Sequence, residues 1–353
     1  MSTCVGVPTE IKPQEGRVAL TPAAAAELVK TGARVCLQSG AGMGSGYADD
    51  AYRRVGVELL DSAEAVYGAA DILLKVKEPV EGELELLRPR HRLFSFLHLA
   101  PNPQLTARLC EIGLTAIAFE TVSDQNNLPI LQPMSEIAGK IAVQVGTHLL
   151  HTPQGGPGKL LGGVPGVGRS DVVVLGAGHA GGAAARLAAA MGAQVSVFDL
   201  NPQRLGEMQA AAPNIGARYV NSEDMRRAVS HADLVVGAVL LPGATAPRLL
   251  SEADVARMGD GSVIVDISVD QGGCIETTRP TSYDDPTYRC KGVTHFCVTN
   301  MPGAVPRTAT QALSGAMMPY LKTLLDDDWR DNRVLRKAVN VTGGRVVHPA
   351  LTG

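Results

Sequence analysis

The segment 176–181, which reads Gly-Ala-Gly-His-Ala-Gly, carries the clearest chemical signal in the sequence. An apolar run predicted as a strand ends just before it, and an alanine-rich run predicted as a helix follows it. Glycines at this spacing permit a tight turn and a close backbone approach to a pyrophosphate, and the N–H groups at a helix N-terminus attract phosphate. The pattern predicts a dinucleotide site at Gly176, Gly178 and Gly181, whereas without this context it would indicate only a turn.

An acidic residue stands where such a site needs one. Asp199 ends the next predicted strand, about 20 residues further on, where a carboxylate accepts hydrogen bonds from the ribose hydroxyls of adenosine. Because a carboxylate repels a 2′-phosphate, the sequence predicts NAD as the cofactor in preference to NADP. Arg204 follows closely and partly offsets that preference. The alternative for Asp199 is a solvated carboxylate at a strand end.

Four cationic or titratable side chains stand at or just after predicted strands in the N-terminal third. They are Arg17, Lys75, Lys77 and His98. The carboxyl ends of parallel strands border the ligand crevice of an open sheet, so these residues are expected to converge. Cations beside a histidine favour a small carboxylate substrate, because a guanidinium binds a carboxylate through its planar fork and an ammonium supplies a compact charge. Solvated surface charges and a structural histidine are the alternatives.

A second acidic segment closes a strand of the nucleotide-binding half. Residues 265–273 leave an apolar strand and enter a glycine-rich loop, so Asp270 is expected at the nicotinamide end of the crevice. Asp266 lies within the apolar run and is interpreted as a structural hydrogen-bonding residue. Asn300 and Met301 follow the next predicted strand and are assigned to the same region.

Apolar runs alternate with helical patterns in two series, which predicts parallel sheets covered by helices on both faces. The first series has strands at 5–7, 35–37, 72–76, 93–97 and 115–118, with helices at 23–30, 63–67 and 105–112. The second series has strands at 172–175, 195–198, 234–239, 263–267 and 296–298, with helices near 182–191, 222–230 and 252–258.

Two domains are expected, because 353 residues exceed what one hydrophobic core usually supports. A helical pattern at 135–150 links the two series, and a Gly/Pro-rich loop at 155–168 follows it. A helix at 308–325 is assigned as the return to the first domain. The fold class predicted is α/β, with two doubly wound Rossmann-like domains. An NAD-binding domain at 129–306, including the linker helix, is inserted into a discontinuous substrate domain at 1–128 and 307–353.

The composition excludes several classes of function. A net charge of −3 without a basic stripe argues against nucleic-acid binding. The N-terminus lacks the pattern of a secretory signal, and the apolar runs are interrupted before membrane-spanning length, so a cytoplasmic protein with small-molecule partners is expected. Six cysteines without a C-x-x-C pair favour reduced thiols and argue against a zinc site, so no metal is predicted.

Taken together, these segments resemble the alanine dehydrogenase family, within the alanine dehydrogenase and pyridine nucleotide transhydrogenase superfamily, over essentially the whole chain. The segments that carry the resemblance are residues 6–10 with 17–19, 75–79, 96–100, 133–136, 162–166, 176–181, 265–273 and 300–302. Several motifs in one order make a chance match very improbable.

The resemblance implies NAD-dependent, reversible oxidative deamination of L-alanine to pyruvate and ammonium, by a homohexamer. It implies that Arg17 and Lys77 bind the substrate carboxylate, that His98 shuttles protons, and that Asp270 stabilises the cationic amine or imine. It places around NAD, beside the glycines, a further set of residues: Ser135, His179, Ala180, Asp199, Arg204, Val239, Leu240, Ile267, Arg279, Val298 and Met301.

Two other readings remain. The NAD(H)-binding component of a proton-translocating transhydrogenase shares this architecture. That family resembles a pattern with Arg-Gln-Asp where this chain has Leu131-Gln132-Pro133, and with Glu at the position of Asp270. These two differences argue against the transhydrogenase reading. A catalytically silent Rossmann regulator is the other reading. The presence of Arg17, Lys77, His98 and Asp270 argues against that reading.

Overall fold

The computed structural model describes residues 3–125, 127–239 and 246–352, which form two compact units. Unit 1 comprises Met1–Met134 and Gly303–Gly353, and unit 2 comprises Ser135–Pro302. The predicted boundaries, 128/129 and 306/307, differ from these by a few residues. Each unit is described separately.

The sheet of unit 1 has eight strands in the order β15-β14-β6-β5-β4-β1-β2-β3. Their bounds are β1 (Cys4–Val7), β2 (Arg34–Gln38), β3 (Glu58–Leu60), β4 (Ile72–Leu74), β5 (Arg92–Ser95), β6 (Thr115–Ala118), β14 (Val339–Thr342) and β15 (Arg345–Val346). Strands β1 to β6 are parallel, and β14 and β15 extend the sheet antiparallel beside β6. The order of the parallel part is that of a doubly wound fold.

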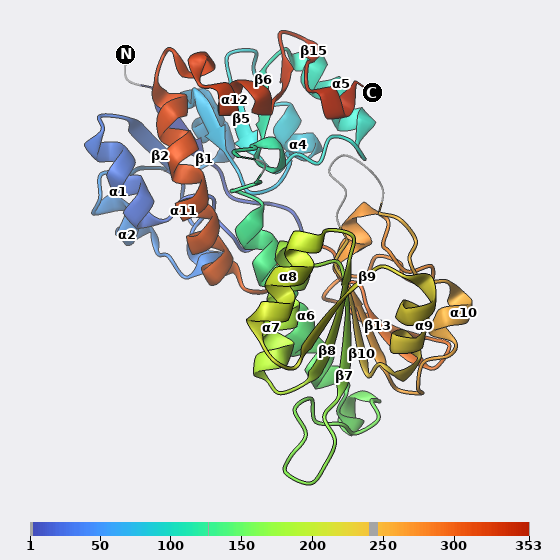
Figure 1. Ribbon diagram of the computed structural model, residues 1–353. Helices are drawn as coiled ribbons and strands as arrows, with labels where there is room; N and C mark the ends of the chain where they lie inside the picture. The colour runs from blue at the N-terminus through green and yellow to red at the C-terminus, as the bar shows by residue number, and fades with distance from the viewer. Residues whose placement is uncertain (1–2, 126, 240–245, 353) are drawn as a thin grey trace. The chain divides into compact units, whose positions relative to one another are not determined.

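Seven α-helices lie in the described part of unit 1. They are α1 (Pro22–Lys30), α2 (Asp49–Arg53), α3 (Ala63–Ala69), α4 (Glu81–Leu84), α5 (Pro103–Ile112), α11 (Pro306–Leu325) and α12 (Arg333–Ala338). Helix α11 returns from the far end of the sequence and lies beside α1 (Figure 1). The side chain of Thr21 caps α1 by accepting the N–H of Ala24, and Ser314 of α11 receives the N–H of Thr21. The predicted return of the late helix to the first half of the chain is therefore observed.

The sheet of unit 2 has seven strands in the order β12-β13-β11-β10-β7-β8-β9. Their bounds are β7 (Asp171–Leu175), β8 (Gln194–Asp199), β9 (Ile215–Tyr219), β10 (Leu234–Gly237), β11 (Val263–Asp266), β12 (Thr287–Cys290) and β13 (Val293–Phe296). All pairs are parallel except β12 with β13. Strands β7 and β10 are neighbours, so the strand order reverses between them. Such a switch point is where open α/β sheets bind ligands.

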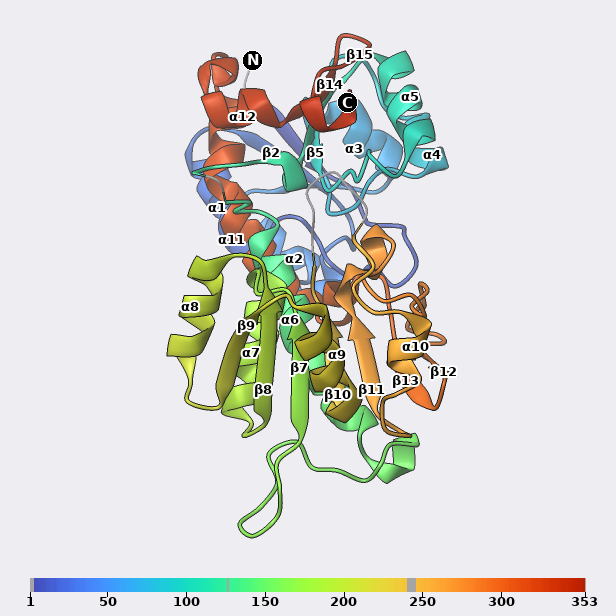
Figure 2. The same ribbon diagram turned by 45° about the vertical axis from the view of Figure 1, so that its right-hand side comes forward.

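The helices of unit 2 are α6 (Gln132–Leu149), whose first turn belongs to unit 1, α7 (His179–Ala190), α8 (Pro202–Ala211), α9 (Ser222–His231) and α10 (Glu252–Val255). Figures 1 and 2 show α7 and α8 on one face of this sheet and α9 and α10 on the other. The Gly/Pro-rich residues 155–168 form a loop without helix or strand, as predicted.

The α/β fold class with two mostly parallel sheets is confirmed. The apolar runs predicted as strands form central strands, and β7, β10 and β11 are buried along almost their whole length. The sequence did not predict the antiparallel strands β12, β14 and β15, of which β12 and β15 are edge strands, or the parallel edge strand β3. It also missed β9, whose residues beyond Ile215 are half-buried or exposed, so that the strand lacks a continuous apolar run.

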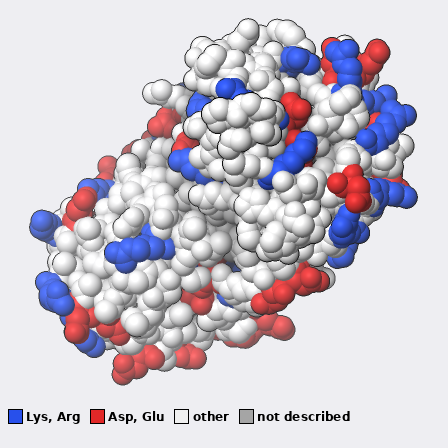
Figure 3. All heavy atoms as spheres, turned by 90° about the horizontal axis from the view of Figure 1, so that it is seen from below, with Lys and Arg blue, Asp and Glu red and all other residues white. Residues whose placement is uncertain are grey.

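Charges of both signs occur in small groups over the face shown in Figure 3. Among residues 3–125, 127–239 and 246–352, no helix is long and apolar enough to cross a membrane. In the same part of the chain no group of histidine, cysteine and acidic side chains is arranged to hold a metal ion. The six cysteines are present as thiols.

A close contact between helices α6 and α7 requires glycine at position 139. A Cβ atom at Gly139 would lie 2.1 Å from the carbonyl oxygen of Ala180. We predict that Gly139→Ala destabilises the protein by about 1–3 kcal/mol, because overpacking outweighs the gain in helix propensity of about 1 kcal/mol. The midpoint of chemical unfolding measures this effect.

Gly68 provides the matched control. It lies on α3, is exposed, and would place a Cβ atom with nothing within 4 Å. Gly68→Ala should therefore leave stability unchanged or raise it by up to about 1 kcal/mol. Equal shifts of the unfolding midpoint in the two variants would contradict the packing argument.

His91 is a fully buried histidine of unit 1 that is neutral in the folded protein. Its Nδ1 accepts the backbone N–H of Arg88 at 3.0 Å, and its Nε2 lies 3.0 Å from the carbonyl oxygen of Tyr67. An Nδ1 that accepts an N–H carries no proton, so Nε2 is the donor to Tyr67. Burial, followed by the charge of Arg90, lowers the pKa of His91 to about 4.

We predict an acid-sensitive component of stability from His91. Because the folded pKa lies below the unfolded value of 6.5, the unfolded state gains a proton first as the pH falls. The free energy of unfolding should decrease by about 3 kcal/mol between pH 6.5 and pH 4 through this group. His91→Asn retains an acceptor near Nδ1 and should lose this part of the pH dependence. An unchanged pH dependence of the unfolding midpoint in His91→Asn would contradict this prediction.

Candidate functional site

In unit 2, the glycine loop after β7 requires its glycines sterically. Gly176 has φ +97°, and a Cβ atom there would lie 2.6 Å from the carbonyl oxygen of Ala238. A Cβ atom at Gly181 would lie 1.8 Å from the oxygen of Gly176. At Gly178 the nearest atom is Nη1 of Arg204 at 3.9 Å, so the backbone there is open to an approaching group. This is the combination of tight turn and accessible backbone that a pyrophosphate needs.

Asp199 holds this loop. Its Oδ2 accepts the N–H of Ala177 at 2.6 Å, and its Oδ1 accepts the N–H of Asn201 at 2.7 Å. The side chain is half-buried at the end of β8. The carboxylate therefore fixes the glycine loop of one strand from the end of its neighbour, a role that sequence analysis did not assign. A solvated strand-end carboxylate does not describe Asp199.

The remaining residues near the loop differ in accessibility. His179 is exposed at the start of α7, followed by half-buried Ala180, and Arg204 is exposed on the first turn of α8. Ser135 is half-buried in the first turns of α6. Arg279 is exposed, with its guanidinium carbon 4.2 Å from the ring centroid of Tyr288.

The loops after β10 and β11 are joined by hydrogen bonds. The N–H of Val239 donates to Oγ of Ser268 at 2.9 Å. The buried Asp266 accepts N–H groups of Ser268 and Cys274 at 2.9 and 3.0 Å, and the hydroxyl of Thr278 at 2.8 Å. Burial raises the pKa of Asp266, with these donors opposing the effect. The interpretation of Asp266 as a structural residue is therefore confirmed.

Asp270, predicted as catalytic, and further expected cofactor residues follow β11 and β13 in this sheet. Asp270 is exposed and Ile267 is half-buried in the turn after β11. After β13, Val298 and Met301 are buried at 1% and 2% exposure. Asn300, between them, is half-buried with φ +59°. Leu240 lies outside the described residues.

In unit 1, Lys75 is committed to a buried ion-pair network. Its Nζ lies 3.3 Å from Oε2 of Glu10 and 2.6 Å from Oε1 of Glu83, and its side chain is 1% exposed. Burial raises the pKa of Glu10, while the charge of Lys75 lowers it. Glu10 also accepts the N–H groups of Val76 and Lys77 at 2.6 and 3.3 Å. Of the two lysines considered from the sequence, Lys75 therefore supports the loop that follows β4. Lys77 lies in that loop and is half-buried.

Arg17 is buried and forms a bidentate ion pair with Glu15. Its Nε donates to Oε1 of Glu15 at 2.6 Å, and its Nη2 pairs with Oε2 of Glu15. Its Nη1 donates to Sδ of Met134 at 3.4 Å. The Nε/Nη2 edge of the Arg17 guanidinium is thus occupied by Glu15.

His98 is exposed in the loop after β5 and has φ +47°, which is uncommon for a residue other than glycine. Its backbone N–H donates to Oε1 of Glu120 at 2.6 Å. Its ring stacks on Phe96 with centroids 6.0 Å apart, and Phe96 in turn packs edge-to-face on Phe119. Local interactions on both sides therefore fix this loop.

Within unit 1 the predicted substrate residues lie in segments that follow neighbouring strands of the sheet. Arg17, Lys77 and His98 follow β1, β4 and β5, which are consecutive neighbours, and the strand order reverses between β1 and β4. The sequence missed the carboxylates that hold these loops: Glu10, Glu15 and Glu120. Only Glu15 had a local signal, two residues before the arginine with which it pairs.

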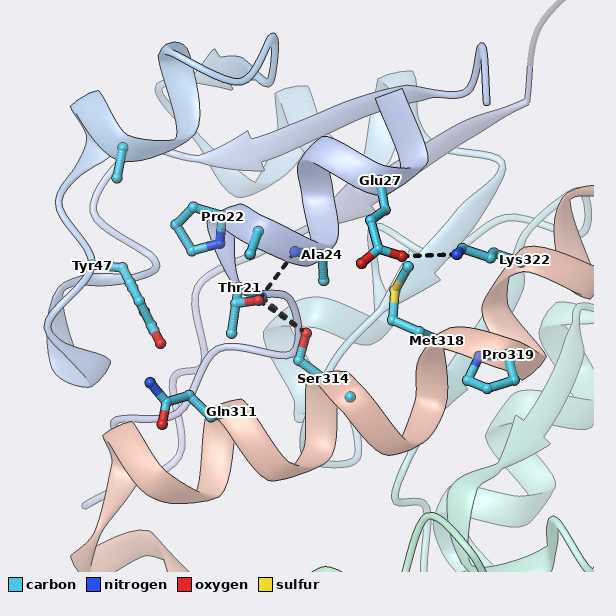
Figure 4. A pocket seen from close by; sticks show the side chains of 13 residues that line it. Thr21, Pro22, Ala24, Glu27, Tyr47, Gln311, Ser314, Met318, Pro319 and Lys322 are labelled. Carbon is cyan, nitrogen blue, oxygen red and sulfur yellow. Dashed lines mark hydrogen bonds and ion pairs between the residues drawn. The ribbon is translucent and has the colours of Figure 1, made fainter. Parts of the chain in front are cut away.

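A separate cavity of about 910 Å³ lies between α1 and α11 in unit 1 (Figure 4). The hydrogen-bonded pair of Thr21 and Ser314 and the ion pair of Glu27 and Lys322 border it. Of the predicted site residues that the structure describes, none lines this cavity. It is therefore distinct from the candidate site.

The residues present in unit 2 fit a dinucleotide. The glycine loop leaves backbone accessible at Gly178, α7 begins directly beyond it, and Asp199 stands at the end of the adjacent strand. A helix N-terminus favours phosphate, and a carboxylate at that strand end favours ribose hydroxyls.

Comparisons with known proteins agree with this arrangement. The N-terminal domain model of the alanine dehydrogenase/PNT family matches residues 6–138, and its C-terminal domain model matches residues 142–349. The alanine dehydrogenase of Mycolicibacterium smegmatis is 47% identical over 353 residues, covering 98% of this chain and 95% of that protein.

Two solved structures share the fold. One titled L-alanine dehydrogenase superposes with a TM-score of 0.95 at 46% identity, covering 99% of this chain and 98% of its own. A transhydrogenase from Sinorhizobium meliloti gives a TM-score of 0.85 at 26% identity, covering 98% of this chain and 99% of its own. The resemblance inferred from the motifs is confirmed. This chain belongs to the alanine dehydrogenase/PNT family.

Proposed function

We propose that this chain catalyses the reversible oxidative deamination of L-alanine to pyruvate and ammonium with NAD. The proposal rests on two candidate sites at equivalent edges of two similar sheets. Unit 2 has a glycine-loop site, and unit 1 has a cationic site with a histidine. The chain shares 46% sequence identity with an L-alanine dehydrogenase and 26% with a transhydrogenase. This difference favours alanine oxidation over the transhydrogenase alternative.

Unit 2 is the proposed NAD-binding domain. The backbone of Gly176, Gly178 and Gly181 and the N-terminus of α7 would bind the pyrophosphate, and Asp199 would bind the ribose hydroxyls. The other cofactor residues of the proposal follow the resemblance: Ser135, His179, Ala180, Arg204, Val239, Ile267, Arg279, Val298, Asn300 and Met301. When bound, NAD accepts the hydride that leaves Cα of the amino acid.

Unit 1 is the proposed substrate domain. Lys77 supplies positive charge for the substrate carboxylate, and Arg17, oriented by Glu15, binds it through an edge that Glu15 does not occupy. The exposed imidazole of His98 moves protons as water adds to the imine and ammonium leaves. Asp270 of unit 2 stabilises the cationic amine or imine.

The proposal also includes a cytoplasmic location and assembly as a homohexamer. The homohexamer follows from the resemblance to the family, and the cytoplasmic location from the N-terminal pattern and the interrupted apolar runs of the sequence. The proposed partners are the small molecules L-alanine, pyruvate and ammonium, without nucleic acid or membrane.

We predict that the protein forms NADH from L-alanine and none from L-lactate, which lacks the amino group. Lys77→Ala should raise KM for L-alanine and for pyruvate by about 10-fold or more, because a charged hydrogen-bonding partner is lost. Steady-state rates in both directions measure this. Lys30→Ala, which removes an exposed lysine at the end of α1, is the control and should leave both values unchanged. NADH formation from L-lactate but not from L-alanine would refute the proposed reaction.

The second prediction of this proposal concerns cofactor selection. Asp199→Asn should weaken NADH binding by about 10-fold or more and reduce the preference over NADPH, because the charge that repels a 2′-phosphate is removed. Fluorescence titration gives both dissociation constants.

The ratio of the two constants separates recognition from loop support. If Asp199 only holds the N–H of Ala177, its replacement weakens NADH and NADPH binding by the same factor, and the assignment is wrong. Asp233→Asn is the matched control, since Asp233 accepts the N–H of Asp171 at the other end of the same strand, β7. It should leave the ratio unchanged.

A further inference from the structure

The loop that carries His98 is held by a carboxylate from the neighbouring strand. Strand β5 ends at Ser95, so the N–H groups of Leu97 and His98 lie beyond the ladder of the sheet. Both donate to Glu120: His98 at 2.6 Å to Oε1, and Leu97 at 3.3 Å to each carboxylate oxygen. One carboxylate side chain therefore satisfies both donors.

Glu120 reaches this position because of sheet register. It follows β6 directly, in a single 3₁₀ turn at Phe119–Thr121, and β6 pairs with β5 through Ser95 and Ala118. The adjacent Phe119 packs edge-to-face on both Phe94 and Phe96, with centroids 4.5 and 5.1 Å apart. These contacts fix the turn that presents the Glu120 carboxylate.

The backbone at His98 needs such support. A φ of +47° is unfavourable for a residue with a Cβ atom, and it persists only where surrounding interactions compensate. The bond from the N–H of His98 to Glu120 is made at this strained residue. On the opposite side, the imidazole lies parallel to the ring of Phe96, at an interplanar angle of 9°.

We propose that Glu120 is a positioning residue for His98, acting through the main chain to hold the imidazole in the orientation that proton transfer requires. The inference deepens the proposed function, on which it rests, by adding a residue that the motifs did not identify. Glu120 bonds the backbone of His98 and not its ring, so its effect on turnover passes through His98.

The proposal makes a graded prediction. Glu120→Ala removes both acceptors and should lower kcat by about 10²-fold, the effect expected when a reacting group is misplaced by about 1 Å. Glu120→Gln keeps one neutral acceptor oxygen and should lose less. If Glu120 itself transferred the proton, Gln and Ala would be equally inactive. NADH affinity should remain unchanged in both variants.

A double-mutant cycle tests whether the effect passes through His98. His98→Ala should lower kcat by about 10²-fold on its own. In the His98→Ala background, Glu120→Ala should then cost no more than about two-fold, because the group that it positions is absent. Asp49→Ala is the matched control: Asp49 accepts the N–H of Gly40 at 2.9 Å in the same unit and should leave kcat unchanged in both backgrounds.

Backbone order gives a second readout that does not depend on turnover. Amide hydrogen exchange in the peptide containing Leu97 and His98 should accelerate in Glu120→Ala and to a smaller extent in Glu120→Gln, and should not change in Asp49→Ala. Unchanged exchange in folded Glu120→Ala protein would overturn the inference. Since Glu120→Gln retains an acceptor, it provides the measurement if Glu120→Ala does not fold.

The outcomes separate this inference from the proposed function. Glu120→Ala could lower kcat by the same factor in the His98→Ala background as in the wild-type protein. That result would overturn the positioning role of Glu120 and leave the proposed reaction intact. Near wild-type kcat in His98→Ala would overturn the assigned role of His98 and this inference together.

The pH profile of kcat tests a further possibility, in which replacement of Glu120 acts through the nearby His348. Burial lowers the pKa of His348, and the charge of Glu120 opposes this effect. An altered pH profile of kcat in Glu120→Gln that survives His348→Gln supports the action through His98, whereas one abolished by His348→Gln contradicts it.

Discussion

Carboxylates that accept backbone N–H groups beyond the carboxyl ends of parallel strands are the interaction on which both candidate sites depend. A strand that ends leaves donors without a ladder partner, and buried donors need acceptors. Glu10, Glu120 and Asp199 each accept two such N–H groups, and each lies on the strand next to a loop that it holds. Asp266 does the same within its own loop. Because Glu10, Glu120 and Asp199 each join their own segment to a neighbouring loop, the two segments cannot rearrange independently.

The choice of a carboxylate follows from hydrogen-bond chemistry. When two N–H donors face one side chain, an amide would meet one of them with its own NH₂ group, whereas an ionised carboxylate only accepts. The choice costs stability, since burial raises the pKa of both Glu10 and Asp266. Lys75 offsets part of that cost for Glu10, and Lys75 in turn requires Glu83. The desolvated charges thus reduce the stability of the folded protein but order its loops. This compromise is typical of functional sites.

The sequence predicted the parts of this structure that have local patterns. Continuous apolar runs marked the central strands, and the glycine spacing marked the loop after β7. The half-exposed strand β9 had no such pattern, and edge strands such as β12 pair in a way that only tertiary structure decides. The carboxylates were hidden for the same reason, because Glu120 meets the loop of His98 across a strand pair, 22 residues away in sequence. The residue pattern alone did not separate Lys75 from Lys77; the family resemblance pointed to Lys77, and the structure shows that Lys75 is buried between acidic side chains.

The two units also show why one topology supports two different roles. Both sheets have the same order of parallel strands, with a reversal between β1 and β4 in unit 1 and between β7 and β10 in unit 2. In unit 2 the helix α7 begins directly after the glycine loop, so its N-terminus and bare backbone stand at the strand end. In unit 1 a long segment separates β1 from α1 and carries Glu10, Glu15 and Arg17 to the equivalent edge. Backbone dipoles suit a pyrophosphate, while side-chain charges suit a small carboxylate. The length of one connection after the first strand therefore distinguishes the two units, and the proposed division of cofactor and substrate binding rests on it.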